Sequence, residues 1–145
     1  MKTAAAAAGL VEIAKADTPK VLTPAQMESV AKLVDLIIPR SDTPGASDAG
    51  VPAYIDRALS RNARSRARFL EGLSHLEAKG FFTATAERQT EMLTAIGKSK
   101  FFKLVKDLTI DGYYTSKPGL TVELGWNANT FLREFKGCTH PEHQV

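Results

Sequence analysis

The sequence predicts an all-α protein: a small bundle of about five to six helices with an irregular C-terminal docking tail. Apolar residues recur at helical spacing between residues 24 and 114, and no strand–helix alternation, internal repeat or glycine-rich phosphate-binding loop occurs. The 145 residues, 43% apolar and 24% charged, suit one soluble globular domain. No apolar run approaches the roughly 18 residues that a membrane-spanning helix needs. We therefore expect a single domain over residues 23–145, with the tail starting at about residue 115.

Residues 1–22 differ in composition from the rest of the chain. Lys2 and the alanine run 4–8 resemble the later part of an export signal, and residues 14–16 fit a small-residue cleavage site. The run is similar to the sequence that follows the arginine pair of twin-arginine signals, but the pair itself is missing. Two interpretations stay open: a remnant export signal, or a flexible N-terminal segment without a targeting role.

The first helix begins with a capping box. Thr23 can cap the helix, Pro24 suits its first turn, and Gln26 can reach back to the backbone of Thr23. Six apolar residues then share one helical face: Met27, Val30, Ala31, Val34, Ile37 and Ile38. Pro39 ends this helix, and a loop rich in Asp, Ser, Pro and Gly follows over residues 40–50.

A second helix is expected over residues 51–61, and a third ends at Gly80. Four arginines lie at offsets of 0, 4, 7 and 11 residues and form one stripe if the helix is continuous: Arg57, Arg61, Arg64 and Arg68. The stripe could be a phosphate-binding face or a solvated, partner-facing edge. We favour the edge, because no aromatic residues interleave for base stacking. The mild net charge of +3 agrees with a protein that has no nucleic-acid partner.

Two more helices complete the bundle. The fourth begins at Thr85, carries Met92, Leu93 and Ile96 on its apolar side, and ends at Gly97. The fifth is supported by five residues and runs to about residue 113 or 114: Phe101, Phe102, Val105, Leu108 and Thr109. The connections between these helices are short, as in a compact bundle.

The last stretch, residues 111–143, has many turn residues and poor helical periodicity. It holds two of the three tyrosines, the only tryptophan, the only cysteine and two of the three histidines. Because aromatic residues on irregular backbone usually pack against something, we interpret this stretch as a docking tail. The interface candidates are Tyr113, Tyr114, Trp126, His140 and His143. The alternative for the aromatic residues is packing in the domain's own core, which we favour for Phe131 and Phe135.

Cys138, His140 and His143 form a CxHxxH string. Three ligands within six residues make a poor tetrahedral metal site and leave a fourth ligand unidentified, so we expect no metal here. The alternative function is a stand-alone helical metal-binding protein or enzyme that uses this string. A single cysteine excludes an internal disulfide, a CxxCH haem attachment site and a multi-cysteine cluster within this chain. We expect no catalytic or cofactor-binding residues in this chain.

Three segments carry a family resemblance: LTPAQMESVAKLVDLIIPRSDTPGASDAGVPAYIDRAL, FFKLVKDLTIDGYYTS and ELGWNANTFLREFKGCTHPEH. They cover most of residues 22–143. On these motifs the chain resembles the small subunit (subunit 3, or gamma subunit) of gluconate 2-dehydrogenase and related bacterial sugar dehydrogenases. The combination of SDTPGAxxAGVPxxID with GYYTS and GCTHPEH is the specific part of the resemblance.

The resemblance implies an accessory subunit that is not an enzyme on its own. In that family a catalytic flavoprotein of the glucose–methanol–choline type binds FAD and oxidises gluconate, glucose or a glycoside, as in glucoside 3-dehydrogenase. Partner subunits can hold haem c, in a cytochrome c that accepts the electrons, or an iron–sulfur cluster. The small subunit stabilises the flavoprotein and helps its twin-arginine export, which implies a periplasmic heterodimer. The missing arginine pair is where this sequence departs from the pattern.

A periplasmic location would give Cys138 a role. An unpaired cysteine on an exposed tail is unstable to oxidation there, and an intersubunit disulfide with the catalytic subunit would resolve this. The alternative is a buried free cysteine that packs as a small apolar residue.

Overall fold

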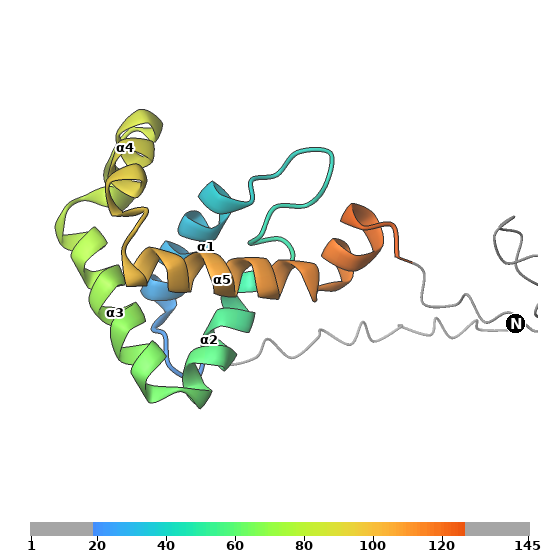
Figure 1. Cartoon of the computed structure of the whole chain (residues 1–145), viewed down its shortest axis with the longest axis horizontal. Helices are drawn as coiled ribbons and strands as arrows, with labels where there is room; N and C mark the ends of the chain where they lie inside the picture. Colours follow the sequence, from blue (N-terminus) through green and yellow to red (C-terminus); the bar gives the residue numbers. More distant parts are fainter. Residues whose placement is uncertain (1–18, 127–145) are drawn as a thin grey trace, which may run out of the picture.

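The computed structural model describes residues 19–126, which form five α-helices and two short helical turns (Figure 1). The α-helices are α1 (Pro24–Ile37), α2 (Val51–Arg61), α3 (Ala63–Ala78), α4 (Ala86–Ile96) and α5 (Lys100–Tyr114). A 3-10 turn, η1 (Phe81–Thr83), lies between α3 and α4, and a π-helical turn, η2 (Gly119–Glu123), follows α5. The described residues contain no strand, so the all-α prediction is confirmed. None of the helices in this range is both long and apolar enough to cross a membrane.

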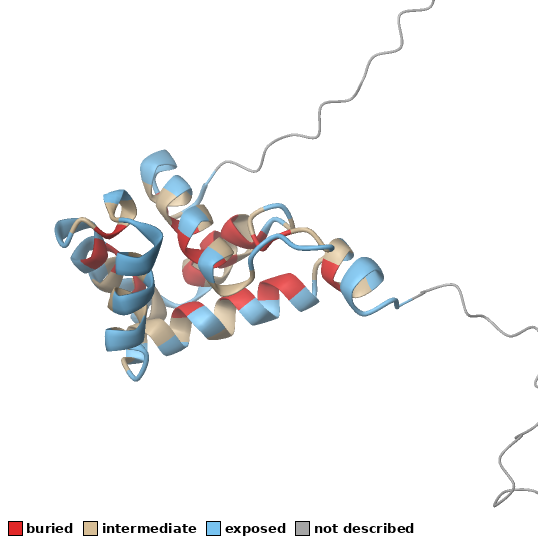
Figure 2. Cartoon of the chain, turned by 90° about the horizontal axis from the view of Figure 1, so that it is seen from above, coloured by how far each residue is buried: buried red, intermediate tan, exposed pale blue. Residues whose placement is uncertain are grey.

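The core forms where α5 packs against α1, α2 and α3. Figure 1 shows α5 crossing in front of α1 and α2, and in Figure 2 the buried residues line the inner sides of the helices. The largest fully buried side chains are Tyr113, Phe69, Phe81, Leu33, Ile55, Leu59 and Leu73. Burying an apolar side chain of this size contributes about 1.5–3 kcal/mol, so this cluster is the main source of stability. The helix that leads into the predicted tail is thus also the central helix of the bundle.

The start of α1 confirms the predicted capping box. The Gln26 backbone N–H donates to the Thr23 hydroxyl at 3.2 Å, and the Thr23 N–H donates to the Gln26 side-chain oxygen at 2.9 Å. These two bonds satisfy backbone donors that the first turn of a helix otherwise leaves free. The cap therefore fixes where α1 begins.

The predicted arginine stripe is divided between two helices, because Asn62 interrupts the helix. Its backbone is extended, with φ −135° and ψ 101°, and its side-chain oxygen accepts from the Ser65 N–H at 3.0 Å. Asn62 therefore ends α2 and caps α3. Arg57 and Arg61 belong to α2, whereas Arg64 and Arg68 belong to α3, so the helix is not continuous and the condition for a single stripe is not met.

Helix α4 lies at one end of the bundle, above α3 in Figure 1, and none of its residues is fully buried. It is held mainly through η1, where the Gln89 side-chain amide donates to the Phe81 carbonyl at 2.9 Å. A groove of about 600 Å³ separates α4 from α1 and α5 and is lined by Leu36, Leu93 and Phe102. This end of the molecule is therefore less tightly packed than the α1–α2–α5 core.

The carboxylate of Asp56 in α2 anchors the chain that enters the domain. The residue is only 3% exposed, and its oxygens accept from the backbone N–H groups of Lys20, Val21 and Leu22 at 2.6, 2.9 and 2.8 Å. Burial acts to raise the pKa of Asp56, but the three N–H donors outweigh it and hold the pKa below its usual range. The anchor therefore depends on an ionised carboxylate.

Asp56→Asn should lower the free energy of unfolding by about 1–3 kcal/mol, because an amide cannot accept all three backbone hydrogen bonds. The lowered pKa contributes stability above the unfolded-state value of about 3.9, and this contribution is lost as the pH falls through the lower folded-state pKa. Urea unfolding between about pH 7 and pH 3 should thus show a steeper loss of stability in the wild type than in Asp56→Asn.

Asp42→Asn is the matched control, since Asp42 is exposed and makes no side-chain hydrogen bond within residues 19–126. Its stability should stay within about 0.5 kcal/mol of the wild type. Identical pH dependence in the wild type and Asp56→Asn would contradict the anchoring role.

Candidate docking surface

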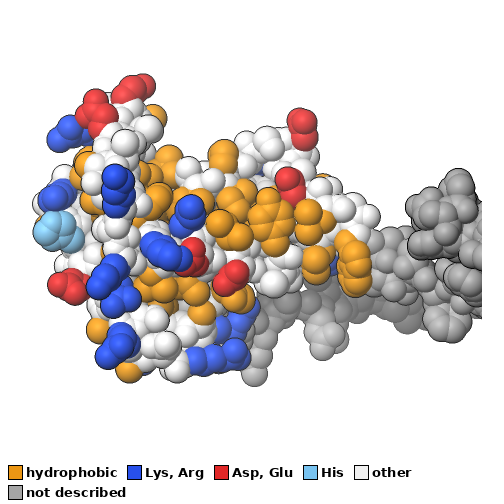
Figure 3. Space-filling view, in the orientation of Figure 1, with side chains coloured by type: hydrophobic (Ala, Val, Ile, Leu, Met, Phe, Trp, Pro, Cys, Tyr) orange, Lys and Arg blue, Asp and Glu red, His pale blue; other side chains and the backbone are white. Residues whose placement is uncertain are grey.

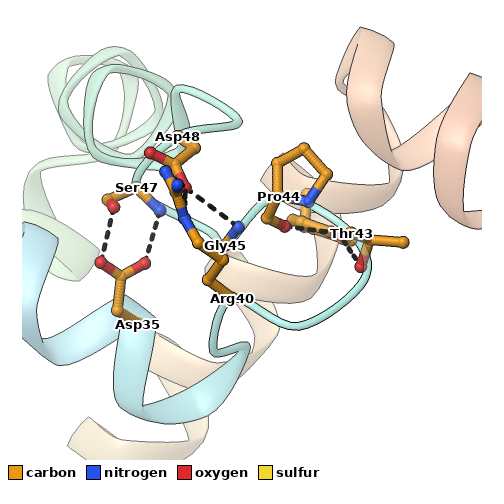
Figure 4. Close-up of polar contacts among 8 residues, drawn as sticks. Asp35, Arg40, Thr43, Pro44, Gly45, Ser47 and Asp48 are labelled. Atoms are coloured by element: carbon orange, nitrogen blue, oxygen red, sulfur yellow. Dashed lines mark hydrogen bonds and ion pairs between the residues drawn. The ribbon is translucent and has the colours of Figure 1, made fainter.

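The loop between α1 and α2 is held by two carboxylates (Figure 4). Asp35 of α1 accepts from the Ser47 backbone N–H at 2.8 Å and from the Ser47 hydroxyl at 2.5 Å. Asp48 accepts from the Arg40 guanidinium at 2.9 Å and from the Gly45 N–H at 3.2 Å. The hydrogen bond from Arg40 is the main reason why the pKa of the Asp48 carboxyl lies below its usual range. The two carboxylates give a loop rich in Gly and Ser a single shape.

This loop in turn holds the C-terminal end of α5. The Tyr113 hydroxyl donates to the Pro44 carbonyl at 2.8 Å and lies 3.4 Å from the Thr43 hydroxyl. Tyr113 is only 1% exposed, so its ring lies in the core and the hydroxyl at its tip satisfies a loop carbonyl. Of the two roles left open for this residue by the sequence, the structure places it in the domain's own core.

The segment after α5 turns back onto the end of that helix. The Ser116 hydroxyl donates to the Tyr113 carbonyl at 2.6 Å and accepts from the Gly119 N–H at 3.1 Å. A Cβ atom at Gly119 would lie 2.0 Å from the Tyr113 carbonyl oxygen, so only glycine permits this contact. Farther on, the backbone N–H of Trp126 donates to the Leu120 carbonyl at 2.8 Å. The first part of the predicted tail therefore has a defined helical turn that the sequence pattern did not predict.

This arrangement exposes a group of large apolar side chains, which we call the α5–η2 face. It consists of Ile110, Tyr114, Val122, Leu124 and Trp126, and these are five of the six large apolar residues that are exposed within residues 19–126. Val122, Leu124 and Trp126 are each more than half exposed, at 54%, 57% and 55%. Figure 3 shows hydrophobic side chains over α5 that continue towards η2. Clustered exposed apolar side chains of this size are typical of a protein–protein interface.

One ring contact and one backbone hydrogen bond position the aromatic residues of this face. Tyr114 packs edge to face against Tyr113, with ring centroids 5.3 Å apart and an interplanar angle of 88°. Trp126 is tied to η2 by its backbone hydrogen bond to Leu120. Tyr and Trp side chains have only two rotatable bonds and therefore lose little conformational entropy on binding, which suits them as anchors in an interface.

The structure places only part of the predicted site. Tyr114 and Trp126 are exposed together on the α5–η2 face, whereas Cys138, His140 and His143 lie outside the described residues, as do Phe131 and Phe135. The disulfide and the CxHxxH string therefore stay predictions. Within residues 19–126, no group of three or more His, Cys, Asp or Glu side chains is arranged to hold a metal ion.

Sequence reasoning missed Ile110, Val122 and Leu124. Ile110 precedes Tyr114 by one helical turn, which is a signal that the sequence does contain. Val122 and Leu124 have no comparable signal, because their exposure depends on how η2 packs against the end of α5.

Tyr113→Phe should lower the free energy of unfolding by about 1 kcal/mol, because it removes the hydrogen bond to the Pro44 carbonyl and leaves the ring in place. Tyr114→Phe removes a hydroxyl that makes no hydrogen bond within residues 19–126, so it should change stability by less than about 0.5 kcal/mol. Urea denaturation of both variants checks this pair. Equal effects would show that the hydroxyl of Tyr113 does not join α5 to the loop.

Comparison with known proteins gives one finding. The model of the family described as Gluconate 2-dehydrogenase subunit 3 matches residues 24–131, a range that includes α1 to η2 and the whole α5–η2 face. Cys138, His140 and His143 lie beyond the matched range. No curated protein and no solved structure matches the chain.

Proposed function

Since the chain belongs to the gluconate 2-dehydrogenase subunit 3 family, which consists of accessory subunits of a dehydrogenase complex, we propose that it is the non-catalytic small subunit of a periplasmic FAD-dependent sugar dehydrogenase. Its role is to bind and stabilise a catalytic flavoprotein of the glucose–methanol–choline type and to help its export. The observation that carries the proposal is the family match over residues 24–131.

The α5–η2 face supports a binding role. Leu124 and Trp126 are exposed to water in the isolated subunit. Burying them against a partner would stabilise the complex by roughly 25 cal/mol for each Å² of apolar area removed from water. Interfaces concentrate their binding energy in a few aromatic anchors, so Trp126 and Tyr114 are the residues that we assign to this role. The face is the site at which the catalytic subunit docks.

The remaining parts of the proposal concern residues outside the described range. Cys138 would form a disulfide with the catalytic subunit, and His140 and His143 would donate hydrogen bonds at the edge of the interface. The partner would hold FAD and select the sugar, whether gluconate, glucose or a glycoside oxidised at C3. A cytochrome c subunit would receive the electrons.

Co-expression of this chain with a flavoprotein subunit encoded beside it tests the proposal. We expect a yellow complex with one FAD per pair of subunits, and dehydrogenase activity that the small subunit alone lacks. On a non-reducing gel the two subunits should migrate together and separate after reduction, and Cys138→Ser should abolish that shift. Loss of the complex under all conditions would overturn the proposed function, whereas a complex without the shift would overturn only the disulfide.

Trp126→Ala should weaken binding to the catalytic subunit by at least about 30-fold, which corresponds to roughly 2 kcal/mol for an aromatic anchor. The dissociation constant is measured by titration calorimetry under reducing conditions, so that a disulfide does not mask the change. Leu36→Ala is the matched control, because Leu36 is 40% exposed but lines the groove beside α4, near Phe102.

Phe102 precedes Tyr114 by 12 residues on α5, a distance of about 18 Å along the helix. Leu36→Ala should therefore leave the dissociation constant unchanged within about threefold. A loss of affinity in Leu36→Ala but not in Trp126→Ala would move the docking site to the groove beside α4.

A further inference from the structure

The junction of α2 and α3 carries a second surface feature, which we call the arginine corner. It consists of Arg57, Arg61, Arg64, Arg66 and Arg68, and these are five of the eight arginines in the sequence. No Asp, Glu or Lys occurs from residue 57 to residue 70. Asp56 precedes the corner, but its carboxylate is buried and accepts hydrogen bonds from the backbone of residues 20–22. The corner is therefore an unusually dense cationic stretch for a chain with a net charge of only +3.

Four of these side chains lack a partner within the described part of the chain. Arg61, Arg64, Arg66 and Arg68 make no hydrogen bond or ion pair there, and Arg61 and Arg64 are exposed. The two arginines elsewhere in residues 19–126 are both paired: Arg40 with Asp48 and Arg88 with Glu91. The corner thus differs from the rest of the described surface in leaving four guanidinium groups, those of Arg61, Arg64, Arg66 and Arg68, without a partner within residues 19–126.

The placement of these charges works against the stability of the isolated chain. Arg64 and Arg68 are one helical turn apart, and like charges at that spacing repel each other. Arg64 also lies in the first turn of α3, which contains no acidic residue and where the helix dipole disfavours a cation. An anionic partner would remove both penalties, so the arrangement is suited to a bound anion rather than to the free subunit.

The side-chain type indicates which anion. A guanidinium forms two parallel hydrogen bonds with a carboxylate, and interfaces between proteins are enriched in Arg and depleted in Lys. The corner contains only arginines, whereas lysines account for 11 of the 19 cationic residues of the whole sequence. No aromatic residue interleaves with the arginines for base stacking, and within residues 19–126 no large apolar residue is exposed on α2 or α3 for insertion into a membrane. A protein surface rich in Asp and Glu is the partner that fits.

We propose that the arginine corner binds a carboxylate-rich surface of the catalytic subunit, an inference that rests on the proposed function. In Figure 3 basic side chains gather along the lower edge of the molecule, where Figure 1 places the α2–α3 junction, below the hydrophobic side chains over α5. The apolar α5–η2 face supplies contact area, and the corner supplies attraction at a distance and fixes the orientation of docking.

The test uses the full chain with the triple substitution Arg61→Gln, Arg64→Gln and Arg68→Gln. Its association rate with the catalytic subunit is measured by stopped-flow fluorescence at salt concentrations from about 20 to 500 mM. We expect an association rate at least about tenfold below the wild type at low salt, and a difference that disappears at high salt, because screening removes the attraction between charged surfaces.

A second triple variant, Lys32→Gln, Lys79→Gln and Lys98→Gln, removes the same net charge from exposed lysines that make no side-chain hydrogen bond or ion pair within residues 19–126. It should bind within about threefold of the wild-type rate, since charges away from the interface contribute little. A third variant, with lysine in place of the same three arginines, should keep most of the association rate but dissociate faster, because lysine keeps the charge and loses the bidentate geometry. Thermal melts confirm that each variant is folded.

The outcomes separate the two proposals. If the wild type forms no complex at any salt concentration, the proposed function fails. If the wild type binds and the arginine variant binds at the same rate, the corner has no role in docking and this inference is overturned. It is also overturned if the substitutions abolish binding to vesicles containing phosphatidylglycerol, or to single-stranded DNA, while the rate with the catalytic subunit is unchanged.

Discussion

The hydrogen bond from the Tyr113 hydroxyl to the Pro44 carbonyl joins the two parts of the chain on which the α5–η2 face depends. On one side is a loop held in shape by Asp35 and Asp48. On the other is the end of α5, whose last carbonyl groups bind Ser116 and so place η2. Tyr114 is the next residue of α5 after Tyr113, and the backbone of Trp126 is hydrogen-bonded to Leu120 of η2, so both exposed residues are attached to these elements. A buried residue thus positions a surface that it does not itself form.

Much of this fold could be predicted from local sequence signals. The capping box at Thr23 and the apolar spacing of the next residues place α1, and the turn-rich loop before Val51 places α2. The end of the second helix at Arg61 was also predicted, but the arginine spacing alone could not decide whether the helix continues beyond it, which the cap at Asn62 excludes. Asp56 binds the backbone of Lys20, Val21 and Leu22, which precede it by 34 to 36 positions in the sequence. No local pattern predicts a contact at that separation.

The docking surface, too, could be predicted only where it does not depend on contacts between separate segments of the chain. The chemistry of Trp126 and Tyr114 marked them as interface candidates, and both are exposed. Tyr113 has the same chemistry, but helix geometry turns its ring inward, so residue type alone could not separate the neighbouring tyrosines. Val122 and Leu124 owe their exposure to η2, which exists because Gly119 lets the chain approach the Tyr113 carbonyl. Tertiary contacts of this kind leave no periodic trace in the sequence.

The central claim is that an accessory subunit docks on its catalytic partner through the α5–η2 face, and hydrogen–deuterium exchange tests it most directly. Exchange would be compared between the free chain and its complex with the catalytic flavoprotein. The account predicts slower exchange on binding over residues 110–126, with α4 little changed. Protection of α4 and the groove lined by Leu36 and Phe102, with unchanged exchange over residues 110–126, would contradict it.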